Sequence, residues 1–106
     1  MAETSLVCAI LRVLVTNHAY GRPLPEDVVL SRASYPPHEG GAAKEAYERV
    51  QSLSFVLDHG DRGIMLDNSA FSALVQFLYD TCNWERFELE LRIKHFEGWD
   101  EIDWSE

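Results

Sequence analysis

SFVLDHGDRGIMLD, residues 54–67, predicts a β-hairpin. Two short apolar runs flank a loop that contains Gly60 and Gly63. Apolar runs of this kind pair as antiparallel strands, and glycine permits the tight reversal because it adopts positive φ without a steric penalty. The two glycines are therefore expected at the tip of the hairpin.

Three helices are predicted before the hairpin, over residues 5–16, 25–34 and 42–52. Apolar side chains recur at helical spacing in each segment. Ser5 is a candidate cap for the first helix, and Pro25 suits the first turn of the second. Two prolines then end the second helix, because a residue before proline is pushed out of helical geometry.

A fourth helix is predicted over residues 69–81, capped by Asp67 or Asn68. The segment 84–97 carries two conflicting patterns. Apolar and charged residues alternate there as in a strand, but Asn83 could cap a helix, and opposite charges recur one helical turn apart. The opposite charges one turn apart are Glu88 with Arg92 and Glu90 with Lys94. We favour a helix, because capping and charge spacing are independent signals.

The fold class that follows is mainly α with a small β-hairpin (α+β). The chain of 106 residues fits one domain, since domains typically have about 100–150 residues. We divide it into a core, residues 1–81, and a C-terminal helix with an acidic aromatic tail, residues 82–106, within the same domain.

The composition is acidic but globular. Nine basic residues stand against 18 acidic ones, a net charge of −9, and 46% of the residues are hydrophobic. A disordered acidic tail is excluded by this hydrophobicity. We expect no membrane span and no secretory signal, because no apolar run approaches about 20 residues and the start lacks a signal pattern. Scarce lysine and excess acid suit either a halophilic archaeal protein or an ordinary acidic protein from a GC-rich genome.

The two cysteines, Cys8 and Cys82, are too few for a disulfide scaffold or a structural zinc site. We therefore expect reduced thiols and a cytoplasmic protein, with Cys8 in the core. No catalytic constellation is present, so an enzyme is not expected. No cofactor or metal is expected either, because the histidines are far apart in the sequence: His18, His38, His59 and His95.

The order of three helices, a hairpin and a further helix resembles a winged helix–turn–helix domain. The phrases "YERVQSLSFVLDHGDRGIMLDNSAF" and "LELRIKHFEGWDEIDW" also resemble small acidic winged-helix proteins of haloarchaea. The resemblance implies a transcriptional regulator that places its third helix in the major groove of double-stranded DNA and its wing against the backbone. The candidate DNA-binding residues it implies are Lys44, Arg49 and Gln51 on that helix and His59 and Arg62 at the wing.

Acidic residues on the same elements oppose DNA binding. Glu45 and Glu48 lie in the middle of the third helix, and Asp58 and Asp61 lie beside the wing. DNA affinity depends largely on neutralising phosphates, so carboxylates there weaken it. The alternatives are a winged-helix module that binds proteins without DNA contact, or an acidic decoy of a nucleic-acid-binding protein.

The C-terminal region is rich in aromatic residues, which are enriched at protein interfaces. They could fold back on the body of the protein or dock on a second subunit, and we expect a homodimer or a protein partner. The candidate interface residues are Trp84, Phe87, Leu91, Phe96, Trp99 and Trp104.

Overall fold

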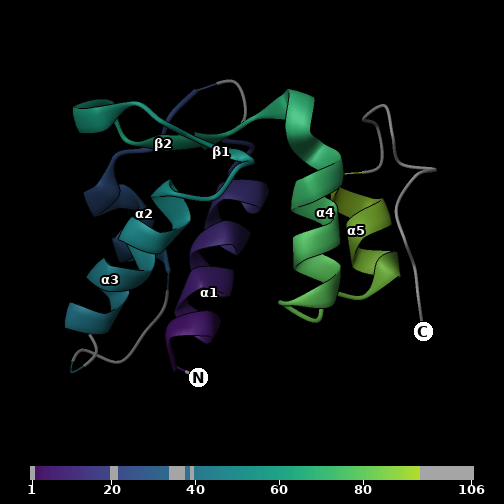
Figure 1. The fold of residues 1–106 in the computed structure, drawn as a ribbon, viewed down its shortest axis with the longest axis horizontal. Helices are drawn as coiled ribbons and strands as arrows, with labels where there is room; N and C mark the ends of the chain where they lie inside the picture. Colours follow the sequence, from purple (N-terminus) through teal and green to yellow (C-terminus); the bar gives the residue numbers. More distant parts are fainter. Residues whose placement is uncertain (1, 20–21, 34–37, 39, 94–106) are drawn as a thin grey trace.

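The computed structural model describes residues 2–19, 22–33, 38 and 40–93 (Figure 1). The predicted class, mainly helical with a small antiparallel hairpin, is confirmed. Along the chain the elements are α1 (Ala2–Thr16), α2 (Glu26–Arg32), α3 (Gly40–Gln51), β1 (Val56–Asp58), β2 (Ile64–Leu66), α4 (Phe71–Asp80) and α5 (Arg86–Ile93). Short 3₁₀ turns precede β2 and α4.

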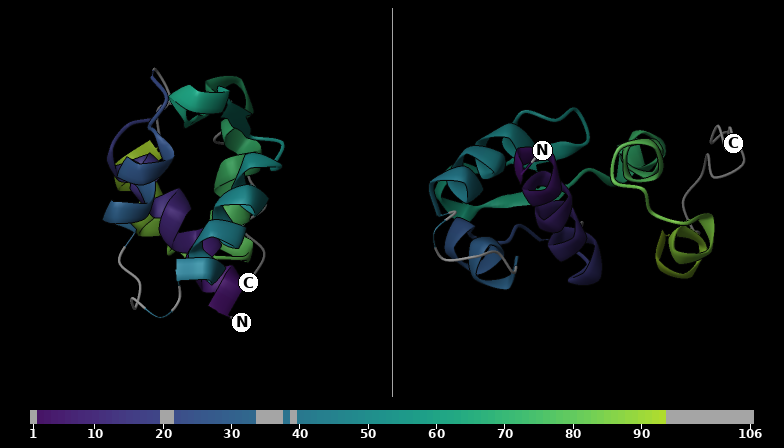
Figure 2. Two further views of the ribbon diagram at one scale, coloured as in Figure 1. Left: turned by 90° about the vertical axis from the view of Figure 1, so that its left-hand side faces the viewer. Right: turned by 90° about the horizontal axis from the view of Figure 1, so that it is seen from below.

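Helix α1 stands at the centre of the molecule. α2, α3 and the hairpin lie on one side of it, and α4 and α5 lie on the other (Figures 1 and 2). α1 contacts both α3 and α5. An amphipathic surface helix buries one stripe of side chains, whereas a helix enclosed on two sides must be apolar around more of its circumference. This explains the seven buried apolar residues of α1: Leu6, Val7, Ile10, Leu11, Val13, Leu14 and Val15.

The hairpin forms where the sequence predicts it, with Val56 opposite Leu66 and Asp58 opposite Ile64. A single 3₁₀ turn makes its tip, and both tip glycines have positive φ, 64° for Gly60 and 106° for Gly63. Both glycines therefore lie at the tip of the hairpin, as predicted, in the conformation that glycine permits.

Strand β2 is paired on both edges. Besides β1, it meets Leu24, whose N–H donates to the Ile64 carbonyl at 2.9 Å and whose carbonyl accepts from the Ile64 N–H at 3.0 Å. The Leu66 N–H likewise donates to the carbonyl of Ala19. The connection between α1 and α2 thus adds a short third strand-like segment to the hairpin and fixes the hairpin against α2.

Asp67, one of the two residues predicted to cap this helix, caps the turn that leads into α4. Its Oδ1 accepts hydrogen bonds from the Ser69 N–H at 2.9 Å and from the Ser69 hydroxyl at 2.6 Å. Both bonds favour the ionised carboxylate and lower the pKa of Asp67. The helix itself begins at Phe71, two residues later than predicted, because the 3₁₀ turn Asn68–Ala70 comes first.

Two of the predicted caps are wrong. α1 begins at Ala2, so Ser5 lies inside the helix and does not cap it. Alanine and glutamate are good helix formers, which explains the earlier start. Asn83 has φ 59° and lies three residues before α5 begins. Asparagine tolerates this left-handed conformation, and here it turns the chain between α4 and α5.

The preference for helix over strand in the C-terminal segment is confirmed over Arg86–Ile93. The i, i+4 pair of Glu88 and Arg92 forms with 3.4 Å between Oε2 and Nε. Leu89 and Ile93 make the buried face of the helix. The rest of the expected segment lies outside the described residues. None of the described helices is both long enough and apolar enough to span a bilayer.

Candidate functional site

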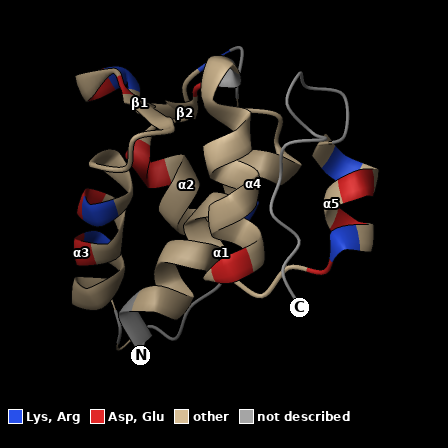
Figure 3. Ribbon diagram, turned by 45° about the vertical axis from the view of Figure 1, so that its right-hand side comes forward, with Lys and Arg blue, Asp and Glu red and all other residues tan. Residues whose placement is uncertain are grey.

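Most of the basic residues implied for DNA binding gather on one surface, formed by α3 and the tip of the hairpin (Figure 3). We call it the α3–wing surface and include the first turn of α2, which adjoins it. Lys44 and Arg49 of α3 are exposed, as are His59 and Arg62 of the tip. The buried side of α3 consists of Ala43, Ala46, Tyr47 and Val50.

Gln51 is the exception among these candidates. It is half-buried, and its Nε2 donates to Oδ1 of Asp58 at 3.4 Å, which links the end of α3 to β1. The same Oδ1 accepts the N–H of Gly60 at 3.0 Å. In this arrangement Gln51 and Asp58 link the hairpin to the end of α3.

The α3–wing surface is hollowed where three elements meet. A pocket of about 460 Å³ lies between the start of α2, Lys44 of α3 and the tip of the hairpin. Its lining is Pro25, Glu26, Asp27, Leu30, Lys44, Gly60 and Asp61. Three carboxylates and one ammonium group therefore line this pocket.

The charges of the α3–wing surface sum to a negative value. Figure 3 shows acidic and basic residues interleaved along α3. Three basic groups, those of Lys44, Arg49 and Arg62, stand against six carboxylates, which gives a net charge of −3. These carboxylates belong to Glu26, Asp27, Glu45, Glu48, Asp58 and Asp61.

The field of these acids reaches the core side of α3. Burial raises the pKa of the Tyr47 hydroxyl to about 12, and the charges of Glu26 and Asp58 add to this effect. A negative field opposes the formation of a phenolate.

The expectation of reduced thiols is wrong: Cys8 and Cys82 form a disulfide, with Cα atoms 5.5 Å apart. The bond joins α1 to the end of α4 across a sequence separation of 74 residues. Cys8 is half-buried at the side of the core. Spacing along the chain does not show such a pairing, because it depends on how α4 returns to α1.

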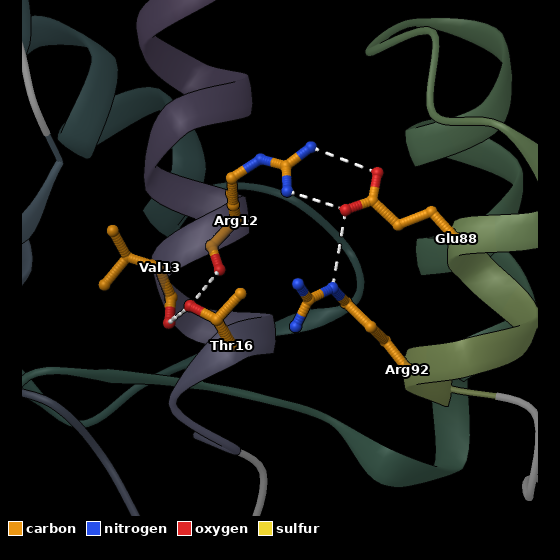
Figure 4. Close-up of polar contacts among 5 residues, drawn as sticks. All are labelled: Arg12, Val13, Thr16, Glu88 and Arg92. Atoms are coloured by element: carbon orange, nitrogen blue, oxygen red, sulfur yellow. Dashed lines mark hydrogen bonds and ion pairs between the residues drawn. The ribbon is translucent and has the colours of Figure 1, made fainter.

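A second link joins α1 to α5 through Arg12 (Figure 4), which follows Cys8 by one helical turn. The Arg12 guanidinium donates two hydrogen bonds to the Glu88 carboxylate of α5, at 2.8 and 3.3 Å. Its central carbon lies 4.3 Å from the centre of the Trp84 ring. The pKa of the Glu88 carboxyl group is lowered, chiefly by the hydrogen bond from Arg12. Arg92 contacts the same carboxylate and lowers the pKa further. Arg12 thus connects α1 to the segment between α4 and α5 and to the first turn of α5.

A pocket of about 220 Å³ lies beside Arg12, between α1 and α2. Its polar side chains already have partners within the protein. The Thr16 hydroxyl donates to the Arg12 carbonyl at 2.8 Å (Figure 4), and the Arg32 guanidinium donates to Oδ1 of Asn17. We assign these groups to structure rather than to ligand binding.

The candidate interface residues separate into two environments. Trp84 is buried beneath Arg12, whereas Phe87 and Leu91 each keep 68% of their surface exposed. The other candidates, Phe96, Trp99 and Trp104, lie outside the described residues. Within the described part of the chain, no group of three or more His, Cys, Asp or Glu residues is placed to hold a metal ion.

Comparisons with known proteins return no match: no family model, no curated protein and no solved structure corresponds to this chain.

Replacing Arg12 tests the second link. We expect Arg12→Met to lower the free energy of unfolding by about 1–2 kcal/mol at pH 7, because it removes an exposed ion pair and the contact with Trp84. Because the pKa of Glu88 is lowered in the folded protein, the ionised carboxylate stabilises the fold at pH values above the ordinary glutamate pKa. This contribution to the free energy of unfolding is lost as the pH falls through the lowered pKa. The difference between wild type and variant should therefore shrink at acidic pH.

Urea unfolding of both proteins at pH 7 and pH 3 measures this effect. Arg86→Met is the matched control, since Arg86 pairs with Glu90 within α5. Equal losses in Arg12→Met and Arg86→Met would contradict a special role for Arg12.

Proposed function

We propose that this protein is a winged-helix module that binds a protein partner through the α3–wing surface, without direct contact to DNA. The observation that carries the proposal is the net charge of −3 on that surface. Duplex DNA presents a dense row of phosphates, and affinity for it rises with the number of phosphates that basic groups neutralise. Three basic groups among six carboxylates favour a basic polypeptide over DNA.

The winged-helix description rests on the arrangement of α1, α2, α3 and the hairpin, and on the Leu24 bridge that fixes the wing beside α2. Such scaffolds serve unrelated functions, so the site and not the fold must decide between them. Glu45 and Glu48 project from the exposed side of α3 and are the first groups that a docked partner meets.

Double-stranded DNA is the second candidate, because Lys44, Arg49 and Arg62 are exposed on the same surface. A DNA-binding regulator would place α3 in the major groove and use these groups on the phosphates. Glu45 and Glu48 would then oppose binding. The two candidates therefore predict opposite effects for the same substitutions.

The discriminating experiment uses Glu45→Gln/Glu48→Gln with two probes, a 20-residue Lys/Arg-rich peptide and a 30-base-pair DNA fragment, in fluorescence anisotropy at matched salt. We expect the wild type to bind the peptide and the variant to bind it roughly fivefold more weakly, at about 0.5 kcal/mol per exposed pair. Glu85→Gln, an exposed carboxylate in the connection before α5, is the control.

Three results together would support DNA binding. The wild type would bind the fragment, Lys44→Ala and Arg62→Ala would weaken that binding, and Glu45→Gln/Glu48→Gln would strengthen it. This pattern would overturn the proposal of a protein partner. Peptide binding that falls equally in Glu85→Gln would also overturn it, because attraction would then come from the total charge of the chain.

A further inference from the structure

The hairpin has one open edge. β2 lies between β1 and the Leu24 segment, so the outer edge of β1 carries no further strand among the residues that the structure describes. An open edge presents backbone N–H and C=O groups that can pair with another strand. The question is therefore which groups this edge offers and which partner they suit.

The hydrogen bonds of β2 show which groups of β1 face the open edge. The N–H groups of Ile64 and Leu66 donate away from β1, to carbonyls of the connection between α1 and α2. Ile64 lies opposite Asp58, and Leu66 lies opposite Val56. Opposite residues of an antiparallel ladder exchange both of their hydrogen bonds or neither, so Asp58 and Val56 direct their backbone groups away from β2.

Three backbone groups of β1 are available along this edge. The Val56 N–H already donates to the Leu53 carbonyl at 3.1 Å. The Val56 carbonyl and the N–H and carbonyl of Asp58 have no hydrogen-bond partner within the described part of the chain. An antiparallel segment can use all three, because one of its residues exchanges two bonds with Asp58 and the residue two positions along donates to Val56.

The side chains of β1 determine which segment fits. Successive residues of a strand point to opposite faces. Asp58 has an exposed carboxylate on one face, so a basic residue suits the position opposite it. Leu57 points to the other face, where 39% of its surface is exposed, and Met65 lies opposite it on β2. An apolar residue suits the position opposite Leu57, so the matching segment alternates basic and apolar residues.

We propose that the open edge of β1 binds an extended basic segment of the partner as an additional antiparallel strand. The inference rests on the proposed function, because it specifies the form in which the partner meets the α3–wing surface. The net charge of −3 on that surface attracts a basic segment, whereas a second copy of this chain would bring two such surfaces of like charge together. In strand addition, backbone hydrogen bonds provide affinity and alternate side chains provide specificity.

Fluorescence anisotropy with a ten-residue peptide of alternating Lys and Val tests the added strand. In the proposed register the lysine N–H groups donate to β1, and the valine N–H groups face solvent. N-methylation of the lysine backbone nitrogens removes two hydrogen bonds and should weaken binding by about tenfold or more. N-methylation of the valines is the matched control, since it keeps the charge of the peptide, and it should change the affinity by less than about twofold.

Leu57→Ser tests the apolar face of the same register. It should weaken binding of the unmethylated peptide by about threefold, because the apolar cross-strand contact is lost. Leu91→Ser removes another exposed leucine, on α5, and should leave binding unchanged. Circular dichroism of both variants should match that of the wild type, because neither side chain is buried in the core.

Amide hydrogen exchange locates the added strand on the protein. In the free chain, the Asp58 amide should exchange faster than the His59 amide, which donates to the Gly63 carbonyl at 2.8 Å. Saturating peptide should slow the exchange of the Asp58 amide by about tenfold or more and should leave the His59 amide nearly unchanged.

The outcomes distinguish this inference from the proposed function. Equal binding of the two methylated peptides, or an Asp58 amide that the peptide does not protect, would overturn the added strand. The proposed function would still stand if Glu45→Gln/Glu48→Gln weakened binding of the same peptide. Absence of any peptide binding would overturn both. A dimer in sedimentation equilibrium that Leu57→Ser dissociates would assign the edge to a second copy and would also overturn the inference.

Discussion

Reduction of the Cys8–Cys82 disulfide is expected to lower the free energy of unfolding by about 4 kcal/mol. The bond closes a loop with a sequence separation of 74 residues. Cross-linking residues so far apart removes many conformations from the unfolded chain, and the chain-entropy relation gives about 4 kcal/mol for this length. A loss of that size is a large part of the roughly 5–15 kcal/mol that holds a typical domain together.

The structure also indicates which part of the protein would lose stability on reduction. The disulfide, the Arg12–Glu88 ion pair and the contact of Arg12 with Trp84 join α4 and α5 to α1. Cys8 and Arg12 are four residues apart and therefore share one face of α1. With the covalent bond cut, the exposed ion pair and the ring contact would contribute only about 1–2 kcal/mol to the linkage.

Thermal unfolding of the oxidised protein, the reduced protein and the Cys8→Ser/Cys82→Ser variant measures the effect. We expect both changes to lower Tm by roughly 15 °C or more, and reduction of the double variant to have no further effect. Peptide mapping without reductant checks that the two cysteines are joined. Two free thiols in the oxidised preparation, or a Tm that reductant leaves unchanged, would contradict the prediction.

The elements that the sequence predicted correctly are those with local causes. The hairpin follows from two apolar runs around Gly60 and Gly63, and both glycines have the positive φ that the tip requires. Asp67 caps through hydrogen bonds to a residue two positions away. Helix α5 was recognisable from charge spacing, and its Glu88–Arg92 pair forms as expected.

The features that the sequence did not predict depend on contacts between distant segments. The disulfide, the pairing of Leu24 with β2 and the placement of Arg12 over Trp84 all join residues that only the complete fold brings together. The helix boundaries deviate for a smaller reason. Helix propensities of ordinary residues differ by only a few tenths of a kcal/mol, so they determine a helix start weakly, and α1 begins at Ala2 instead of after Ser5.

The elements that carry the candidate residues were predictable, but the surroundings of those residues were not. Lys44 and Arg49 are exposed on α3, and Arg62 is exposed at the tip of the hairpin. Gln51 could not be separated from them by sequence, because its role follows from the approach of Asp58. The acids at the start of α2 were also missed as part of this surface. They reach it because Leu24, just before α2, pairs with Ile64 of β2, and Lys44, Glu26 and Asp61 line one pocket.

The second large effect is expected for Gly63→Ala, which should lower the free energy of unfolding by about 3–5 kcal/mol. A β-carbon at this position would lie 1.8 Å from the Leu24 carbonyl oxygen and 2.7 Å from the Cα of Pro25. Both are backbone atoms. Leu24 cannot move away without breaking its two hydrogen bonds to Ile64.

Gly60→Ala separates this close approach from the cost of backbone conformation. Gly60 also has positive φ, 64°, but nothing lies within 4 Å of its added β-carbon. Alanine there should cost about 1–2 kcal/mol, the penalty of the left-handed conformation alone. Urea unfolding measures the free energy of unfolding of both variants. We assign the difference between the two values to the contact between the hairpin and the Leu24 segment.

Hydrogen exchange then shows how the chain accommodates Gly63→Ala. If the wing separates from the body, the amides of Leu24 and Ile64 should lose protection while the amides of α1 keep theirs. Such local opening would displace Arg62 from Lys44 and Arg49, and any ligand of the α3–wing surface should bind more weakly. Equal stability of Gly63→Ala and Gly60→Ala would show that the wing does not depend on Leu24. The third strand-like segment would then have no part in fixing that surface.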